Sequence, residues 1–195
     1  METGLYVALS SQMSLEKRLN TIAHNVANSN TSGFRAGKVR FEEVLGKAST
    51  VTPSFVNEGK SYLDPQSGGL EETGGTLDFA VQGDVWFSAQ SPAGVLVTRD
   101  GRFKMQQTGE LVTMDGHSVL DPGGSPIQLN TVGGKVKVAP DGVITQNGVQ
   151  TAAIGLFEYQ PSANFSRFGN SGIVAESAPI PVVDRSDVGV VQGFI

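Results

Sequence analysis

The first thirty or so residues carry a regular helical pattern. Apolar side chains recur at alternating steps of three and four residues, which is the spacing of a coiled-coil seam over about three heptads. A single polar position, Gln12, interrupts the row. The apolar members are Leu5, Ala8, Leu15, Leu19, Ile22 and Val26. Neither glycine nor proline occurs between Leu5 and Ser32, so the pattern predicts one long helix that ends within residues 28–33.

The remaining faces of this helix are polar but nearly uncharged. Between Thr3 and Phe34 the only full charges are Glu16, Lys17 and Arg18. Most solvated helices carry more charge, and the small polar residues that fill the other positions suit contact with protein. No second stretch of helical period follows, and a heptad seam matches a sheet face poorly. We therefore expect the helix to pair outside this chain; the alternative is an amphipathic helix packed on its own domain.

From about Gly74 the pattern changes to that of short strands. Runs of strand-forming residues alternate with turn residues. The runs are 77–81, 86–90, 95–99, 102–105, 110–113, 118–120, 127–129, 135–138, 143–145 and 153–159. Alternation is clear at 102–105 and 135–138, where one side faces a core and the other faces water. The pattern predicts an all-β domain of many short strands, either a sandwich or an irregular barrel.

Glycine-containing dipeptides punctuate these runs. Aspartate-glycine and asparagine-glycine pairs are strong hairpin signals, because both residues tolerate a positive φ. Such pairs are Asp100-Gly101, Asp115-Gly116, Asp141-Gly142 and Asn147-Gly148. We therefore expect positive φ angles at Gly101 and Gly142.

Residues 35–73 separate the helix from the strands. Phe41, Val44 and Leu45 suggest a short helical turn, and Pro53 and Pro65 interrupt any regular element after it. We interpret this stretch as an extended connector. The expected parts are an N-terminal helix at 1–34, the connector at 35–73 and an all-β domain at 74–195.

Charge and composition narrow the class of protein. The net charge is −5, which provides no basic face for nucleic acid. No apolar run approaches the roughly 18 residues of a membrane helix, and no pattern of a cleaved signal peptide is visible. Cysteine is absent, which excludes disulfides, thiolate catalysis and cysteine-ligated zinc. We expect neither nucleic-acid binding nor membrane insertion.

The chain offers few residues for chemistry. Its two histidines, His24 and His117, lack the spacing of a metal site, and we expect both at ordinary polar surface positions. Glu42-Glu43 and Glu71-Glu72 are adjacent pairs, whereas glycoside hydrolysis needs two carboxylates facing each other across a cleft. We expect no enzyme activity and no cofactor.

The Trp86-Phe87 pair has two interpretations. Two neighbouring aromatic residues can form a platform on which a sugar ring stacks. They can also belong to a buried strand, which we favour because large aromatic side chains dominate protein cores.

Two stretches resemble the flagellar rod and hook protein family. The first is at the N-terminus and comprises Gly4-Leu5-Tyr6, Ser11-Gln12-Met13 and residues 19–35. In the last of these, a helix reading Ile22-Ala23-His24-Asn25-Val26-Ala27-Asn28 leads into Asn30-Thr31-Ser32-Gly33-Phe34-Arg35. The second runs from Glu72 through Thr76-Leu77-Asp78-Phe79-Ala80-Val81-Gln82-Gly83-Asp84 to Asp115-Gly116, and is similar to the β domain shared by that family. The tryptophan in Val85-Trp86-Phe87 is more like the proximal-rod type than the distal-rod or hook type.

The resemblance implies a structural protein of the flagellar basal body. Members assemble into a tube through terminal helices, with the β domain in the outer wall, and are exported by the flagellar export apparatus without a cleaved signal. The expected partners are other rod subunits and further copies of the chain. Family members end in a second long helix, and we expect that helix to be missing from this sequence, which then represents a fragment. The expected interface residues are Leu5, Leu15, Leu19, Ile22, Asn25, Val26, Asn28 and Asn30.

Two alternatives remain open at this point. Within the family, the chain could be a distal-rod or hook subunit. Outside it, the chain could be a β-sandwich carbohydrate-binding module with a helical tail for oligomerisation.

Overall fold

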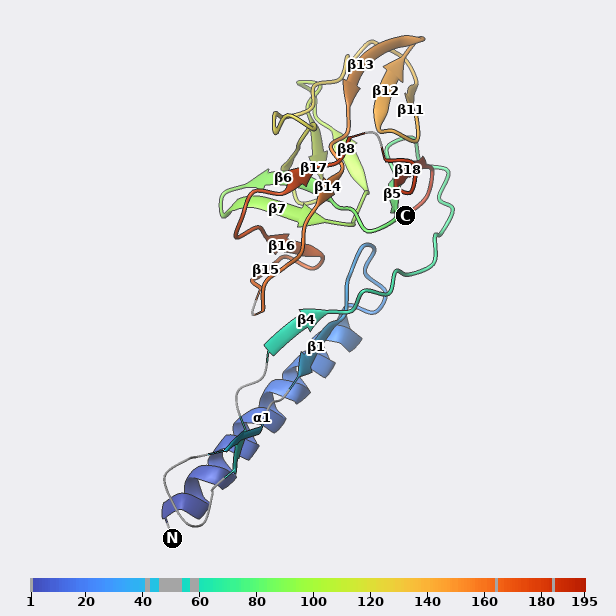
Figure 1. Cartoon of the computed structure of the whole chain (residues 1–195). Helices are drawn as coiled ribbons and strands as arrows, with labels where there is room; N and C mark the ends of the chain where they lie inside the picture. Colours follow the sequence, from blue (N-terminus) through green and yellow to red (C-terminus); the bar gives the residue numbers. More distant parts are fainter. Residues whose placement is uncertain (1, 41–42, 46–53, 57–59, 164, 184) are drawn as a thin grey trace. The chain divides into compact units, whose positions relative to one another are not determined.

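The computed structural model describes residues 2–40, 43–45, 54–56, 60–163, 165–183 and 185–195 (Figure 1). The residues described form a mainly β protein with one helix, as the sequence pattern predicts, and their strands form no closed barrel. Internal contacts divide the chain into two compact units. The helical unit comprises Met1–Asn30, Arg35–Gln66 and Ser162–Phe165; the β unit comprises Thr31–Phe34, Ser67–Pro161 and Ser166–Ile195.

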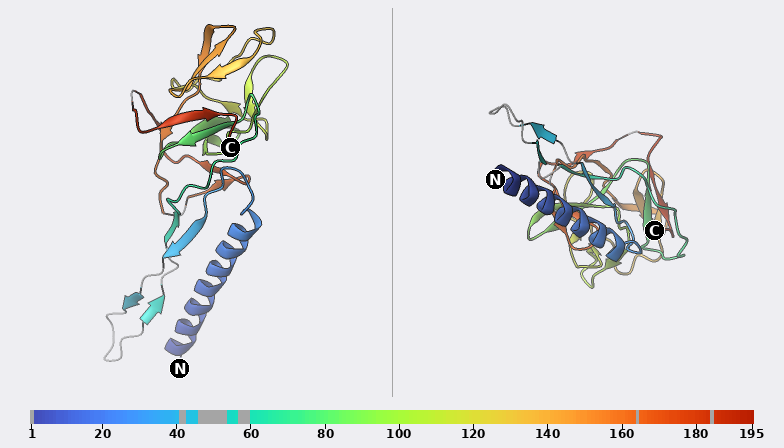
Figure 2. Two further views of the ribbon diagram at one scale, coloured as in Figure 1. Left: turned by 90° about the vertical axis from the view of Figure 1, so that its right-hand side faces the viewer. Right: turned by 90° about the horizontal axis from the view of Figure 1, so that it is seen from below.

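The helical unit is built on one long helix, α1 (Glu2–Ala27), which runs without interruption (Figure 1). Two antiparallel strand pairs accompany it. They are β1 (Gly37–Arg40) with β4 (Lys60–Leu63), and β2 (Glu43–Leu45) with β3 (Ser54–Val56). Both β1 and β3 lie alongside α1, as two further views show (Figure 2).

These strands differ from the extended connector expected for residues 35–73. Val44 and Leu45 belong to strand β2, so the expected helical turn there is wrong; Phe41 lies outside the described residues. In β1 and β4, Gly37 stands opposite Leu63 and Arg40 opposite Lys60. The two runs are separated by about twenty residues, and a reading of local pattern does not reveal a partner at that distance.

The side chain of Asn25 fastens the end of α1 to β1. Its amide nitrogen donates to the carbonyl of Gly37 at 2.8 Å, and its amide oxygen accepts from the N–H of Gly37 at 2.9 Å. This is the pairing that another strand would make, and it satisfies both polar groups of a buried residue. Asn25 therefore fixes the direction in which the chain leaves the helix.

The β unit contains several small antiparallel sheets. The largest has seven strands in the order β15-β16-β7-β6-β10-β9-β8. These strands are β6 (Phe87–Ser91), β7 (Gly94–Thr98), β8 (Phe103–Met105), β9 (Leu111–Thr113), β10 (Ser118–Val119), β15 (Arg167–Phe168) and β16 (Gly172–Val174). A second sheet has three strands, β11 (Val136–Val138), β12 (Val143–Gln146) and β13 (Val149–Ala153). Two pairs complete the unit, β5 (Phe79–Gln82) with β18 (Gly189–Gln192) and β14 (Phe157–Glu158) with β17 (Ile180–Pro181).

Aromatic side chains organise the core of the β unit. The ring of Phe103 lies 6.0 Å from that of Phe79 and meets Phe87 edge to face at 5.2 Å. Phe79 and Phe87 are fully buried. Aliphatic side chains from the three-stranded sheet and its connections, such as Ile144 and Ile154, join the same cluster. The sheets are therefore held by one shared apolar core.

A buried arginine ties together three parts of the β unit that are distant in sequence. The guanidinium of Arg99 donates to the Gly83 carbonyl at 2.7 Å and to the Ser67 hydroxyl at 3.1 Å. It also lies 5.3 Å from the centre of the Trp86 ring and pairs with Asp84 at 3.2 Å. Its charge is offset by these partners, which is the condition for burying a cation.

The side chain of Gln192 seals the outer edge of strand β11. It accepts from the N–H of Val138 at 3.1 Å and donates to the carbonyl of Val136 at 3.0 Å. An open strand edge offers such groups to any passing chain. Here one amide side chain occupies two of them and joins β11 to β18.

Two turn glycines behave differently from each other. Gly142 has a φ of 87°, as expected, and the hairpin signal Asn147-Gly148 is confirmed, with φ angles of 51° and 80° between β12 and β13. The expectation of a positive φ at Gly101 is wrong. A Cβ on Gly101 would lie 1.7 Å from the Phe79 carbonyl oxygen, so glycine is required there by close packing and not by φ.

Three alanine substitutions separate these two reasons for glycine. Gly101→Ala should lower the free energy of unfolding by about 3 kcal/mol or more, through overpacking against the backbone. Gly148→Ala should cost about 1–2 kcal/mol, since its Cβ meets open space and only the positive φ is unfavourable. Gly68→Ala, with neither problem, should change stability by less than about 0.5 kcal/mol. Urea unfolding followed by the fluorescence of Trp86, the single tryptophan, measures all three; equal effects at Gly101 and Gly68 would contradict the packing argument.

The Asn25 pairing yields a second prediction. Asn25→Ala leaves the polar groups of Gly37 without their partner, which costs about 1–3 kcal/mol locally. The amide of Gly37 should then exchange with solvent faster in hydrogen-exchange measurements. Asn20→Ala, at an exposed position of the same helix, is the matched control and should leave that rate unchanged. An unaltered rate in Asn25→Ala would show that the pairing does not hold β1 to the helix.

Candidate assembly interface

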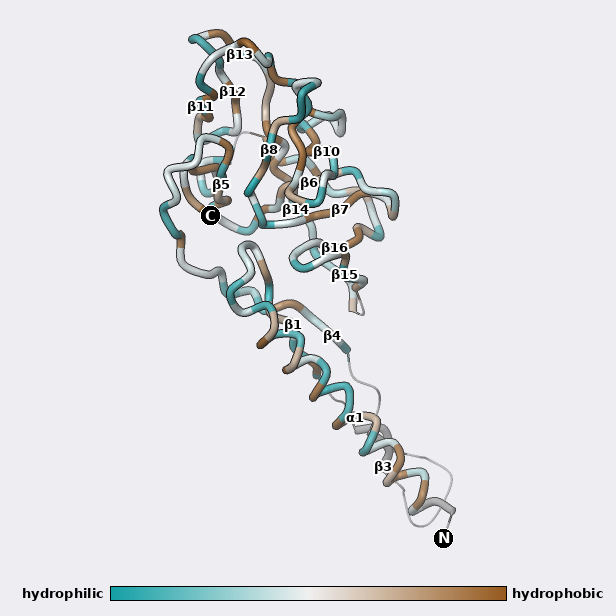
Figure 3. Tube along the Cα trace, turned by 180° about the vertical axis from the view of Figure 1, so that it is seen from behind, coloured by the Kyte–Doolittle hydropathy of each residue, from teal (hydrophilic) through white to brown (hydrophobic). Residues whose placement is uncertain are grey.

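Helix α1 exposes its apolar seam. The five large apolar side chains expected at the interface all lie on one face of the helix. Their exposed fractions are 69% for Leu5, 61% for Leu15, 65% for Leu19, 48% for Ile22 and 69% for Val26. Figure 3 shows hydrophobic positions recurring along the whole length of α1. We call these five residues the apolar seam; the described residues of the chain leave them largely uncovered.

The opposite side of α1 carries a row with the same spacing, in which every side chain except that of Val7 is polar. This row is shifted from the apolar seam by two residues, or about 200° around the helix. Its members are Val7, Ser10, Ser14, Lys17, Thr21, His24 and Asn28, all of which are buried or half-buried. They lie on the side that the rest of the helical unit covers. The helix thus turns its polar row inward and its apolar seam outward.

Hydrogen bonds within the helix make this arrangement possible. The hydroxyl of Ser14 donates to the carbonyl of Ser10 at 2.8 Å, and that of Thr21 donates to the carbonyl of Lys17 at 2.9 Å. A hydroxyl that bonds its own helix needs no partner across the contact. The small side chains also allow neighbouring backbone to approach closely. The covered side therefore needs no apolar residues of its own.

The three asparagines expected at the interface lie in different surroundings. Asn25 pairs with Gly37 as described, and the amide of Asn28 donates to the carbonyl of His24 at 2.9 Å. Asn30 is exposed. Asn25 and Asn28 thus hold the chain's own backbone, while Asn30 is available at the surface. No local pattern indicates the Asn25 pairing, because its partner Gly37 lies twelve residues away on a strand.

The residues that follow α1 divide between the two units. In the β unit, a Cβ on Gly33 would lie 2.1 Å from the backbone nitrogen of Asp100, and Gly33 has a φ of 70°. The ring of Phe34 lies 4.8 Å from the guanidinium carbon of Arg167, whose pKa is lowered by burial. Glycine and phenylalanine in this motif are therefore packing requirements of the β unit.

The next residues stabilise the helical unit. The buried side chain of Arg35 donates to the Asp64 carbonyl at 2.8 Å. Lys38 pairs with the Asp64 carboxylate at 2.7 Å, and this hydrogen bond lowers the pKa of Asp64 and raises the pKa of Lys38. Asp64 thus receives both basic side chains, one on its backbone and one on its carboxylate.

Among the described residues, the two histidines and the Trp86-Phe87 pair do not come together in one site. Glu42 lies outside the described residues. His24 lies in the last turn of α1 and His117 lies in the β unit, so the two belong to different units. Trp86 and Phe87 are buried, with exposed fractions of 3% and 0%. The expectation that this pair belongs to the core is confirmed. A tryptophan covered by Arg99 offers no platform for a sugar ring.

Comparisons with known proteins agree with this structure. Residues 5–35 match the flagella basal body rod protein family, and residues 80–146 match the flagellar hook protein FlgE/F/G D1 domain. The first match covers α1 and the motif after it, and the second covers strands β5 to β12. No helix in the described part of the chain is long and apolar enough to cross a membrane.

The chain is also similar to flagellar basal-body rod proteins of the FlgF and FlgG types. The flagellar basal-body rod protein FlgF of Rhizobium meliloti is 56% identical over the whole chain, which covers 81% of that protein. FlgF of Mesorhizobium japonicum is 53% identical over the same extent. The rod protein FlgG of Bacillus subtilis is 30% identical over 88% of the chain and 72% of its own length. On the strength of the exposed helix, the β unit and these relatives, the chain belongs to the FlgF family of flagellar basal-body rod proteins.

Proposed function

We propose that this chain is a structural subunit of the flagellar basal-body rod that joins other rod and hook subunits through the apolar seam of α1. The observation that carries the proposal is the orientation of the helix. Its polar row faces the chain's own helical unit, and its apolar seam faces solvent. A helix that served only its own domain would be turned the other way.

The strength of this contact can be estimated from the apolar seam. Full burial of one large aliphatic side chain contributes about 1.5–3 kcal/mol, and these five are roughly 60% exposed, so together they offer on the order of 5–9 kcal/mol. Association costs about 4–15 kcal/mol in lost freedom. The burial of one apolar seam therefore about balances the free-energy cost of association. Several contacts formed together would give a stable assembly, while one contact alone would leave the subunit monomeric.

We further propose that the subunit belongs to the proximal rod, which the relatives support. Identity to FlgF proteins reaches 56%, against 30% for FlgG of Bacillus subtilis. This supports a proximal-rod subunit over the alternative of a distal-rod or hook subunit. The buried Trp86 argues against the carbohydrate-binding alternative.

We also propose an export route and partners for the subunit. We place the subunit in the basal body, reached through the flagellar export apparatus without a cleaved signal peptide. Its partners there are copies of itself and neighbouring rod subunits. The chain acts as an assembly helix and a β module, with neither enzyme activity nor a cofactor. Its lack of cysteine suits export in an unfolded state, since no disulfide has to form or break.

A charge placed in the apolar seam tests the proposal. Leu19→Asp would put a carboxylate into a helical interface, where an unpaired charge is strongly unfavourable. Rod incorporation and swimming should be lost in the bacterium that encodes the protein. The Trp86 fluorescence transition of the purified variant should keep its midpoint, because Trp86 reports the β unit and Leu19 belongs to the helical unit.

Asn20→Asp is the matched control for this experiment. It adds the same charge at an exposed polar position one residue from Leu19, and cells that carry it should swim. Normal swimming of Leu19→Asp cells would show that the apolar seam is not an assembly element. An early Trp86 transition in Leu19→Asp would show instead that the helix stabilises the β unit.

A further inference from the structure

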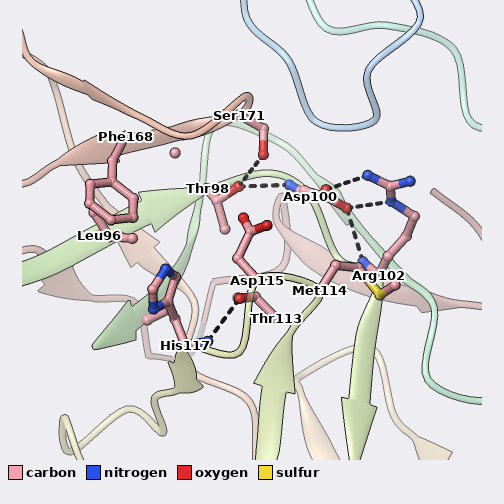
Figure 4. A pocket seen from close by; sticks show the side chains of 12 residues that line it. Leu96, Thr98, Asp100, Arg102, Thr113, Met114, Asp115, His117, Phe168 and Ser171 are labelled. Atoms are coloured by element: carbon pink, nitrogen blue, oxygen red, sulfur yellow. Dashed lines mark hydrogen bonds and ion pairs between the residues drawn. The ribbon is translucent and has the colours of Figure 1, made fainter. Parts of the chain in front are cut away.

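The β unit contains a hollow between two turns. Its floor is formed by buried residues of β6, β7 and β16, namely Ala89, Leu96, Thr98 and Gly172. One wall is the turn between β9 and β10, with Met114, Asp115 and His117. The other is the turn between β15 and β16, with Phe168 and Ser171, and Asp100 and Arg102 close one end (Figure 4).

Most polar groups around the hollow are already bonded to one another. The Asp100 carboxylate accepts from Arg102 Nε at 2.9 Å and from Nη2 at 2.7 Å, and this pairing raises the pKa of Arg102. The hydroxyl of Thr98 accepts from the Asp100 N–H at 3.0 Å and lies 3.3 Å from the Ser171 hydroxyl. These groups form the fixed frame of the hollow.

The carboxylate of Asp115 is different. It accepts no hydrogen bond from any residue that the structure describes, and it points into the hollow toward Thr98 and Ser171 (Figure 4). Its Oδ2 lies 3.6 Å from the position that a Cβ on Gly169 would occupy, so the opposite turn approaches it without a side chain. The imidazole of His117 contacts the Phe168 ring edge to face at 5.3 Å. One acceptor group and a pair of rings thus remain for a ligand.

The charged side chains around the hollow determine whether it favours a cationic or an anionic ligand. Among the residues that line the hollow, the carboxylates of Asp100 and Asp115 outnumber the single guanidinium of Arg102, and Asp100 is already paired with it. The ammonium of Lys104, outside the hollow, donates to the Met114 carbonyl at 2.8 Å. The nearby guanidinium of Arg167 is turned to Phe34. The balance is negative, so a cation is favoured and an anion is not. Leu96, Met114 and Phe168 supply apolar surface for an aliphatic stem.

We propose that this hollow binds the side chain of an arginine presented by another protein chain. Asp115 accepts hydrogen bonds from the guanidinium, whose planar fork matches a carboxylate. The rings of Phe168 and His117 contact its flat face or its stem, as arginine does on aromatic surfaces. This site belongs to the β unit and does not depend on the apolar seam. It would provide the rod subunit with a second, polar contact.

A small probe tests the site on the full chain. N-acetyl-arginine amide is titrated into isotope-labelled protein, with N-acetyl-citrulline amide as the neutral probe of the same shape. The arginine probe should shift the signals of Asp115, His117, Phe168 and Gly169 saturably, with a dissociation constant on the order of 1–10 mM for so few atoms. The citrulline probe should bind at least about fivefold more weakly, since it lacks the charge.

Matched variants locate the binding. Asp115→Asn keeps the shape of the turn and should weaken the arginine probe about fivefold. Glu71→Gln removes an exposed carboxylate elsewhere in the β unit and should leave binding unchanged. Equal shifts with the arginine and citrulline probes would overturn the proposal. So would arginine-induced shifts that persist in Asp115→Asn, or shifts that spread over the whole acidic surface. Because the probe binds the monomer, failure here is distinct from failure of the seam, which Leu19→Asp tests.

Discussion

The orientation of α1 is the constraint on which the architecture of the helical unit depends. A helix normally buries its leucines against its own domain, because that burial supplies most of its stability. Here the hydroxyls of Ser14 and Thr21 are satisfied within the helix, and Asn25 bonds both polar backbone groups of Gly37. The helical unit can therefore be ordered while the residues of the apolar seam remain exposed. In the assembly that we propose, the contacts that stabilise the subunit and those that join it to its neighbours lie on different faces of one helix.

The β unit solves the opposite problem, because it must be complete in itself. Its sheets share one apolar cluster, and its polar connections close on side chains of the same unit, such as Arg99 and Gln192. Many of its strands have only two or three residues, which gives each little stability alone. The tight turns and the common core compensate for that shortness. We therefore expect the β unit to fold without a neighbour.

The sequence predicted the elements that local pattern encodes. The seam of α1, the buried Trp86 and the Asn147-Gly148 hairpin all follow from the spacing or chemistry of adjacent residues. The strands β1 and β4 were missed, since each depends on a partner far along the chain. Strands β15 and β17 contain two residues each, too few for any period to appear. Gly101 shows a further limit. Its neighbours in the sequence indicate a turn, but glycine is required at this position because the Phe79 carbonyl leaves no room for a Cβ. The same limit applies to the Asp115 hollow, which forms only when two turns meet.

The sealed edge of β11 has a consequence for polymer growth. A subunit that polymerises must also avoid aggregating through strand pairing, and exposed sheet edges are a common site of such aggregation. By occupying Val136 and Val138 with its own amide, Gln192 removes a docking position that any extended chain could otherwise use. If subunits arrive unfolded, as the proposed export route requires, they present many such chains. In the proposed assembly, an occupied β11 edge would disfavour strand-to-strand aggregation of such chains.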